Sequence, residues 1–249
     1  MSIPVLAIDA GNTRITWGLH DGREWVLRGA FKTTDIAGSH VFIDAMKASD
    51  LDCVVLSNVA GPSVAAAIKH QVHDWHKPIC CITAEARRCG VVNHYNHPAQ
   101  LGSDRWAALI AAQTAAAGAP RAQLVVMAGT ALTVDALGAD GYFLGGIIVP
   151  GLKLMHRALH GGTAQLPSTS GQYQTFPKCT GDAISSGATE ACAGAIQRMY
   201  THLSVQAGHS PHCIGSGGVM SELAPHLPFP ILIDDHLVLE GLVIIANTA

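Results

Sequence analysis

A short polar turn between two apolar runs near the N-terminus constrains this chain more than any other feature. Residues 9–16 read Asp-Ala-Gly-Asn-Thr-Arg-Ile-Thr, and the runs on either side are rich in Ile, Val and Leu. Such a pattern predicts two strands joined as a hairpin. The turn can offer backbone N–H groups and the Thr13 hydroxyl to phosphate oxygens, with Asp9 holding a hydrated Mg²⁺. The alternative is an ordinary hairpin in which Gly11-Asn12 supplies a positive φ and Asp9 is a solvated strand end.

A second copy of this turn favours the phosphate interpretation. Residues 127–133 read Met-Ala-Gly-Thr-Ala-Leu-Thr and follow another apolar strand. When Asn12 is omitted, the two segments align, with Met127 at the position of Asp9. Two strand–Gly–Thr–strand turns half a chain apart predict a duplicated domain. Facing one another across a cleft, they would hold the two ends of a nucleoside triphosphate.

The order of predicted elements indicates an α/β fold. A chain of 249 residues fits two domains, and the Ala-Gly-Ala-Pro-Arg segment at 117–121 predicts the boundary, giving domains 1–118 and 119–249. A hairpin opens each half, and strands then alternate with helices, so each half is expected to be a mixed sheet covered by helices. The predicted strands are 3–9, 14–20, 25–31, 53–58, 79–83, 123–137, 142–149, 212–216 and 230–233, and the predicted helices are 36–48, 63–76, 103–117, 151–160, 181–206 and 237–247.

Composition narrows the partners and the compartment. The net charge is −3 and no basic cluster exceeds the pair Arg87-Arg88, so neither nucleic acid nor a membrane surface is an expected partner. No basic leader precedes the first apolar run, and no apolar segment reaches the ~18 residues that span a bilayer. Seven cysteines occur without a Cys-x-x-Cys pair, which favours reduced thiols and a cytoplasmic location.

A second polar segment carries acid–base and anion-binding groups. Residues 101–106 read Leu-Gly-Ser-Asp-Arg-Trp, and Ser103 is predicted to cap a long Ala-rich helix. Asp104 then lies in the first turn, where the helix dipole should lower its pKa. Arg105 is unfavourable at a helix N-terminus unless a carboxylate or an anionic ligand offsets its charge. Asp104 can therefore orient a substrate hydroxyl while Arg105 grips a polar or anionic substrate.

Two other kinds of site receive less support. The chain has no Gly-Lys dipeptide, which excludes a Walker-type phosphate loop. His70, His73 and His76 recur every three residues on a predicted helix, and a solvated face explains them better than a metal site.

Taken together, these motifs resemble the type III pantothenate kinase family over nearly the whole chain. The similarity is carried by the order and spacing of several segments: Asp9-x-Gly11-Asn12-Thr13, Tyr95, Leu101-Gly102-x-Asp104-Arg105, Gly129-Thr130-Ala131-x-Thr133-x-Asp135, Gly145-Gly146-Ile147-Ile148-x-Pro150-Gly151-Leu152, Thr180-x-x-Ala183-Ile184-x-Ser186-Gly187, Gly217-Gly218 and Leu237-Val238-Leu239-Glu240-Gly241-Leu242.

The resemblance implies two similar domains of the actin and sugar-kinase ATPase superfamily around a central cleft, assembled as a homodimer. It implies transfer of the ATP γ-phosphate to pantothenate, giving 4'-phosphopantothenate in the first step of coenzyme A biosynthesis. Asp104 would be the general base, and Asp9 would lie near Mg²⁺. The implied ATP-binding residues are Asp9, Ala10, Gly11, Asn12, Thr13, Arg14, Ile15, Thr16, Gly129 and Thr130, and the implied pantothenate-binding residues are Tyr95, Gly102, Ser103, Asp104, Arg105 and Thr180. Asp135 would lie near the nucleotide or its metal.

One position departs from the family pattern. The family carries an Asp two residues before the second Gly-Thr, where it helps to bind an activating K⁺ or NH₄⁺ ion. This chain has Met127 there, and a thioether has little affinity for a hard cation. The monovalent-cation site is therefore expected to be absent, altered or built from other groups.

Two alternatives use the same residues differently. The chain could phosphorylate another small metabolite on the same fold, because a fold does not fix a substrate. It could also bind nucleotide or pantothenate as a regulator without turnover, which only Met127 favours; Asp9, Asp104 and Arg105 argue against it.

Overall fold

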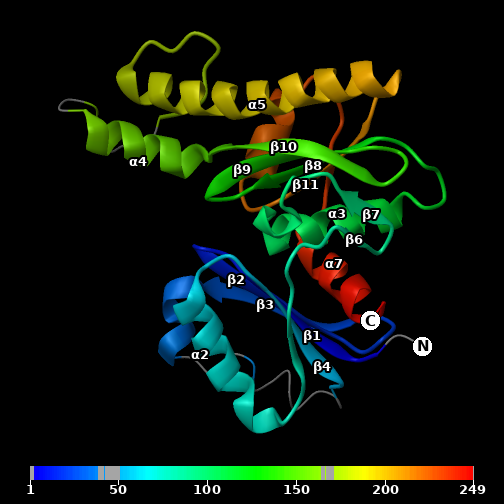
Figure 1. The fold of residues 1–249 in the computed structure, drawn as a ribbon. Coiled ribbons are helices and arrows are strands. Elements are labelled where there is room, and N and C mark those ends of the chain that lie inside the picture. The colour runs from blue at the N-terminus through cyan, green and yellow to red at the C-terminus, as the bar shows by residue number, and fades with distance from the viewer. Residues whose placement is uncertain (1–2, 39–41, 43–50, 164–165, 167–170, 249) are drawn as a thin grey trace. The chain divides into compact units, whose positions relative to one another are not determined.

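The chain folds into two compact units, described here from a computed structural model that covers residues 3–38, 42, 51–163, 166 and 171–248. One unit comprises Met1–Gly118 with His236–Ala249, and the other comprises Ala119–Asp235. The chain therefore leaves the first unit at residue 118 and returns to it at residue 236, whereas the sequence assigned 236–249 to the second domain. Figure 1 shows the elements.

The first unit is built on a mixed sheet with the strand order β3-β2-β1-β4-β5. The β1–β2 and β2–β3 pairs are antiparallel, whereas β4 and β5 join in parallel. The strands of this sheet are β1 (Val5–Ala10), β2 (Arg14–His20), β3 (Trp25–Lys32), β4 (Cys53–Asn58) and β5 (Ile79–Cys81). The short strands β6 (Arg87–Arg88) and β7 (Val91–Asn93) pair with one another and are not part of it. The helical segments are η1 (Thr33–Gly38), α2 (Pro62–Val72), η2 (His73–Trp75), η3 (Pro98–Gln100), α3 (Ser103–Ala115) and α7 (Leu237–Ala246).

Helices cover both faces of this first sheet. Leu6 and Ile8 of β1 point into a core with Ile68 of α2, whereas alternate residues point to the opposite face, which is in contact with α3 and α7. Because β1 is buried on both faces, it reads as a continuous apolar run until Asp9. Asp9 therefore lies on the face that carries α3 and α7.

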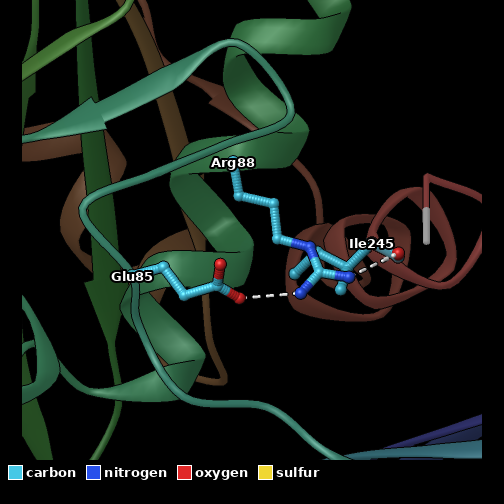
Figure 2. A network of polar contacts seen from close by, with 3 residues as sticks. All are labelled: Glu85, Arg88 and Ile245. Carbon is cyan, nitrogen blue, oxygen red and sulfur yellow. Dashed lines mark hydrogen bonds and ion pairs between the residues drawn. The ribbon is translucent and has the colours of Figure 1, made fainter.

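The last helix belongs to the first unit because of close packing on α3. A Cβ atom on Gly241 of α7 would overlap the backbone of Ala107 in α3, so the glycine allows the two helices to touch. Glu240 also accepts a hydrogen bond from the Trp25 indole N–H at 2.6 Å. Near the other end of α7, Arg88 bridges Glu85 at 2.7 Å and the carbonyl of Ile245 at 3.2 Å (Figure 2). A cation at a helix C-terminus is favourable for the helix dipole.

The second unit repeats the plan of the first. Its strands lie in the order β12-β11-β8-β9-β10, with antiparallel pairs on one side of β8 and parallel pairs on the other. The strands are β8 (Gln123–Ala128), β9 (Ala131–Leu137), β10 (Tyr142–Pro150), β11 (His212–Ser216) and β12 (Leu232–Ile233). The helical segments are α4 (Leu152–Gly162), α5 (Thr180–Ala207), α6 (Met220–Leu223) and η4 (Ala224–His226). Leu124, Val126 and Val134 form a core with Ile196 of α5 and Met220 of α6.

The predicted duplicated α/β architecture is confirmed, with two local corrections. The run given as a single strand at 123–137 is two strands, β8 and β9, and the chain reverses between them at the predicted Gly129-Thr130 turn. The helix predicted at 36–48 begins in the 3-10 segment η1, which ends at Gly38, and most of the remainder lies outside the described residues. No helix in the described part of the chain is long and apolar enough to cross a membrane.

Candidate active site

Asp9 lies at the centre of the first sheet, one residue before β1 ends. Its neighbours in register are Thr16 of β2 and Ser57 of β4. Asp9 Oδ1 is shielded from solvent and has no hydrogen-bond partner among the described residues. A buried carboxylate oxygen without a donor is unfavourable unless a cation or another polar group reaches it.

The surroundings of Asp9 favour a bound cation. The pKa of Asp9 is raised to about 7, chiefly by burial and secondly by the nearby Asp104 carboxylate, while a hydrogen bond from Ser57 opposes both effects. Two neighbouring carboxylates repel one another when both are ionised, and a cation between them removes that repulsion. Carboxylate oxygens are also ligands that Mg²⁺ prefers. The donor set of Asp9 therefore fits a divalent metal ion.

The first turn of α3 places Asp104 beside this site. Gly102, not Ser103, is the N-cap residue, and no side chain caps the helix. The predicted cap is wrong because the Ser103 hydroxyl points to Ser57, with 3.0 Å between the two Oγ atoms. Asp104 Oδ1 accepts a hydrogen bond from the Arg105 N–H at 2.8 Å. A Cβ atom on Gly102 would lie 2.5 Å from that oxygen, so glycine leaves room for the carboxylate to fold back.

Burial decides the proton affinity of Asp104. It raises the pKa of Asp104 above the usual carboxyl value, although the backbone N–H and the guanidinium of Arg105 both lower it. The prediction that the helix N-terminus would lower this pKa is therefore wrong, because desolvation outweighs the nearby positive charge. A carboxylate with a raised pKa is a stronger base, which suits proton abstraction from a hydroxyl.

Arg105 and Tyr95 lie together in the first unit. The Arg105 side chain donates from Nη2 to the Tyr95 hydroxyl at 3.3 Å, and its guanidinium carbon lies 5.9 Å from the ring centroid. Arg105 is 5% exposed. Asn93 holds the loop that carries Tyr95, because it accepts from the Tyr95 N–H at 3.0 Å and donates to the Pro98 carbonyl at 3.1 Å.

The predicted phosphate turn of the first unit is a tight β-hairpin. Gly11 N–H donates to the Arg14 carbonyl at 3.0 Å, and the Asn12 side chain donates to the Val59 carbonyl at 3.2 Å. Ala10 and Ile15 have fully buried side chains, so only their backbone atoms are available to a ligand. The exposed residues of the turn are Asn12, Thr13 and Arg14.

The corresponding turn of the second unit is shorter, and neighbouring backbone segments approach it so closely that only glycine fits at two positions. Gly129 and Thr130 are exposed, and Gly129 N–H donates to the Ala131 carbonyl at 3.0 Å. A Cβ atom on Gly151 would overlap the Gly129 carbonyl, and one on Gly217 would overlap the Ala128 carbonyl. Gly217 also has a positive φ of 105°, which a non-glycine residue rarely adopts.

Two backbone hydrogen bonds around the first turn have counterparts around the second. Thr33 N–H donates to the Thr13 carbonyl at 3.1 Å, and Gly151 N–H donates to the Thr130 carbonyl at 3.0 Å. On the opposite side of each turn, the N–H groups of Val59 and Val219 donate to the carbonyls of Ala10 and Ala128, at 3.0 and 3.5 Å respectively. This equivalence places Thr13 at the position of Thr130.

The side chains beneath the two turns differ. In the second unit Met127 pairs in register with Thr133 of β9 and with Ser216 of β11, as Asp9 does with Thr16 and Ser57. Asp135 lies further along β9 and is fully buried. The internal alignment made from sequence therefore gives the correct partners for Met127.

The predicted site residues fall in both units. The first unit brings together Asp9, Tyr95 and the segment Gly102–Arg105, whereas Gly129, Thr130 and Thr180 lie in the second. Thr180 is the exposed first residue of α5. Within the described residues, no group of three or more His, Cys, Asp or Glu side chains is arranged to hold a metal ion.

Sequence reasoning missed two buried polar residues, Ser57 and Asn93. Ser57 is 0% exposed and Asn93 is 6% exposed, and both contact predicted site residues. The polar end of the predicted strand 53–58 could have pointed to Ser57, because parallel strands align their carboxyl ends and would bring it near Asp9. Nothing comparable pointed to Asn93, whose role depends on the fold of one loop.

Comparison with known proteins identifies relatives along most of the chain. The family model described as type III pantothenate kinase matches residues 5–202. A type III pantothenate kinase from Aromatoleum aromaticum is 47% identical over 245 residues, covering 98% of both chains. One from Nitrosospira multiformis is 45% identical over 244 residues, covering 98% of this chain and 91% of the relative.

Solved structures show the same fold at lower identity. An inorganic polyphosphate/ATP-glucomannokinase from Arthrobacter is 17% identical with a TM-score of 0.50 and covers 98% of each chain. A glucokinase from an Antarctic psychrotroph is 10% identical with a TM-score of 0.52 and covers 99% of each chain. At these identities the likeness concerns the actin and sugar-kinase ATPase fold.

Proposed function

The chain belongs to the type III pantothenate kinase family and phosphorylates pantothenate with ATP in coenzyme A biosynthesis; we propose that Asp104 is the general base of this reaction. The observation that supports this role is the partly buried Asp104 carboxylate at the start of α3. It accepts a hydrogen bond from the Arg105 N–H, and burial raises its pKa. Asp104 would accept the proton of the pantothenate hydroxyl as that oxygen attacks the γ-phosphorus of ATP in line with the departing ADP.

Arg105 and Tyr95 are proposed to bind pantothenate. The guanidinium is nearly buried and always charged, so it suits the carboxylate of this substrate. The Tyr95 hydroxyl and ring fix the guanidinium by a hydrogen bond and a cation–π contact. Gly102 and Ser103 contribute to the substrate site through the backbone, since the Ser103 hydroxyl is bonded to Ser57. Thr180 is proposed as a further substrate contact from the second unit.

The turns are proposed to bind ATP, through residues 9–16 in the first unit and through Gly129 and Thr130 in the second. Kinases of this kind use ATP with a divalent metal ion, and Asp9 is the proposed ligand or near neighbour of Mg²⁺. When bound, this ion neutralises negative charge on the phosphates during transfer. The unpartnered Oδ1 of Asp9 supports the assignment. In this arrangement the Asp9 carboxylate faces the ion, and the backbone N–H groups of the turn orient the phosphates.

The monovalent-cation site is proposed to be absent or altered in this protein. The family's Asp at this position is Met127 here, and its partners in register are the neutral residues Thr133 and Ser216. Neither a thioether nor two hydroxyls supply the negative charge of a carboxylate. A homodimer is also proposed, on family membership alone; sedimentation velocity would separate it from a monomer.

The experiment that tests the function is ADP release from purified protein with Mg-ATP, with and without pantothenate, in sodium, potassium and ammonium buffers. We expect release that depends on pantothenate and is similar in the three salts. Release without pantothenate, or none with folded protein, would contradict the proposed catalytic arrangement. Strong stimulation by potassium alone would contradict only the proposal about Met127.

A further inference from the structure

Ser57 lies beneath the proposed metal site without belonging to the recognised motifs. It is in parallel register with Asp9 and has an exposed fraction of 0%. Its neighbours Val54 and Leu56 point into the core beneath α2, so Ser57 points to the face that carries α3. A buried hydroxyl at this position needs polar partners.

Ser57 has two polar neighbours, the Asp9 carboxylate and the Ser103 hydroxyl. Ser57 donates to the Asp9 carboxylate, and its Oγ lies 3.0 Å from Ser103 Oγ. A serine hydroxyl has one proton to donate. Either hydroxyl can donate in the Ser57–Ser103 contact, and when Ser57 gives its proton to Asp9 it accepts the proton of Ser103. The result is a chain of bonds from the first residue of α3, through Ser57, to Asp9.

This chain of bonds leaves one oxygen of Asp9 open. Oδ1 has no partner among the described residues, while Ser57 lies in register with Asp9 on the neighbouring strand and lowers its pKa through a side-chain hydrogen bond. A carboxylate held through one oxygen keeps the second in a fixed direction, as outer hydrogen bonds do for metal ligands generally.

We propose that Ser57 is a positioning residue that orients Asp9 toward the divalent metal ion and couples that orientation to the turn bearing Asp104. The inference rests on the proposed assignment of the metal to Asp9. In the second unit Ser216 occupies the equivalent position, but its partner in register is Met127, so the proposed role of orienting a carboxylate is specific to the serine of the first unit.

The test measures metal affinity separately from turnover. Mn²⁺ binding to the full-length protein, in the presence of a non-hydrolysable ATP analogue, is followed by electron paramagnetic resonance for wild type, Ser57→Ala and Ser204→Ala. We expect Ser57→Ala to weaken Mn²⁺ binding about tenfold and to raise the Mg²⁺ concentration needed for half-maximal kcat. The KM for pantothenate should change less. Ser204 bonds only within its own helix, to the Tyr200 carbonyl at 2.8 Å, so its variant controls for loss of a hydroxyl.

Three outcomes separate the possibilities. Unchanged Mn²⁺ affinity in a folded Ser57→Ala protein overturns the positioning role, even if kcat falls. If Asp9→Asn also leaves Mn²⁺ affinity unchanged, the assignment of the metal to Asp9 fails as well. If Ser57→Ala does not fold, Ser57→Cys keeps the shape with a weaker donor and should weaken Mn²⁺ binding by a smaller factor; wild-type affinity in that variant overturns the proposal.

Discussion

The hairpin turns of the two units share a backbone but not a chemistry. The N–H of the residue that follows β3 or β10, Thr33 or Gly151, donates to a carbonyl of each turn. The residue beneath each turn also has an equivalent partner in register on the next strand. The first turn rests on Asp9 and the second on Met127. The two units therefore share backbone hydrogen bonds around the turns, while the proposed metal ligand Asp9 has Met127 as its counterpart. Backbone geometry and side-chain chemistry are separable in this fold.

The largest expected effect on activity comes from removing the carboxylate of Asp104, the proposed general base in the first unit. Asp104→Asn should lower kcat by about 10²–10⁴-fold, because the amide cannot accept the substrate proton. Binding of an ATP analogue should be nearly unchanged, and isothermal titration calorimetry with steady-state kinetics would measure both. A kcat within tenfold of wild type would mean that Asp104 only binds substrate.

The next prediction concerns the stability that the first turn loses by holding a buried carboxylate. In the folded protein the pKa of Asp9 is about 7, above its ordinary value of 3.8. Between these values the native state keeps a proton that the unfolded chain has released, so this contribution to stability falls as the pH rises toward 7 and stays low above it. Above pH 7, metal-free Asp9→Asn should be more stable than wild type by about 2–4 kcal/mol.

Urea unfolding in the presence of a chelator would test this at about pH 5 and about pH 8.5, which lie on either side of the Asp9 titration in the folded protein. The advantage of Asp9→Asn should shrink at the lower pH. An advantage that is independent of pH would show that burial does not disfavour the ionised form of Asp9.

Arg105→Ala should chiefly raise the KM for pantothenate, by about 10- to 100-fold for loss of a charge-assisted contact. Arg88→Ala is the matched control in the same unit, because Arg88 bonds Glu85 and the end of α7 instead (Figure 2). It should lower the free energy of unfolding by about 1 kcal/mol without changing KM. Equal losses of kcat and kcat/KM in Arg105→Ala would place the guanidinium in the transition state.

The smallest effect sharpens the comparison by making the two turns alike. Met127→Asp restores a carboxylate beneath the second turn, in register with Thr133 and Ser216. Its activity should become a few-fold higher in potassium or ammonium than in sodium, because an anionic oxygen is the ligand that hard cations prefer. A variant that remains active but gains no such response would count against Met127 as the reason for salt independence.

The sequence alone predicted the features that are set by short, contiguous segments and by the internal repeat. The Gly-Thr turns, the strands around them and the alignment of Met127 with Asp9 follow from local patterns, and the register confirms that alignment. The roles of Ser57 and Ser103 depend on contact between two segments distant in sequence. The pKa of Asp104 depends on how much solvent the fold removes, which no local pattern reports.

The packing of α7 on α3 bears on how the protein is made. Ribosomes release the chain from its N-terminus, and domains generally fold in that order as they emerge. Here the helix that covers β1 and α3 is encoded after the whole second unit. The first unit must therefore wait with part of its apolar surface uncovered while the second is synthesised. Chaperone binding to the nascent chain should be strongest in that interval and should end when residues 237–246 leave the exit tunnel.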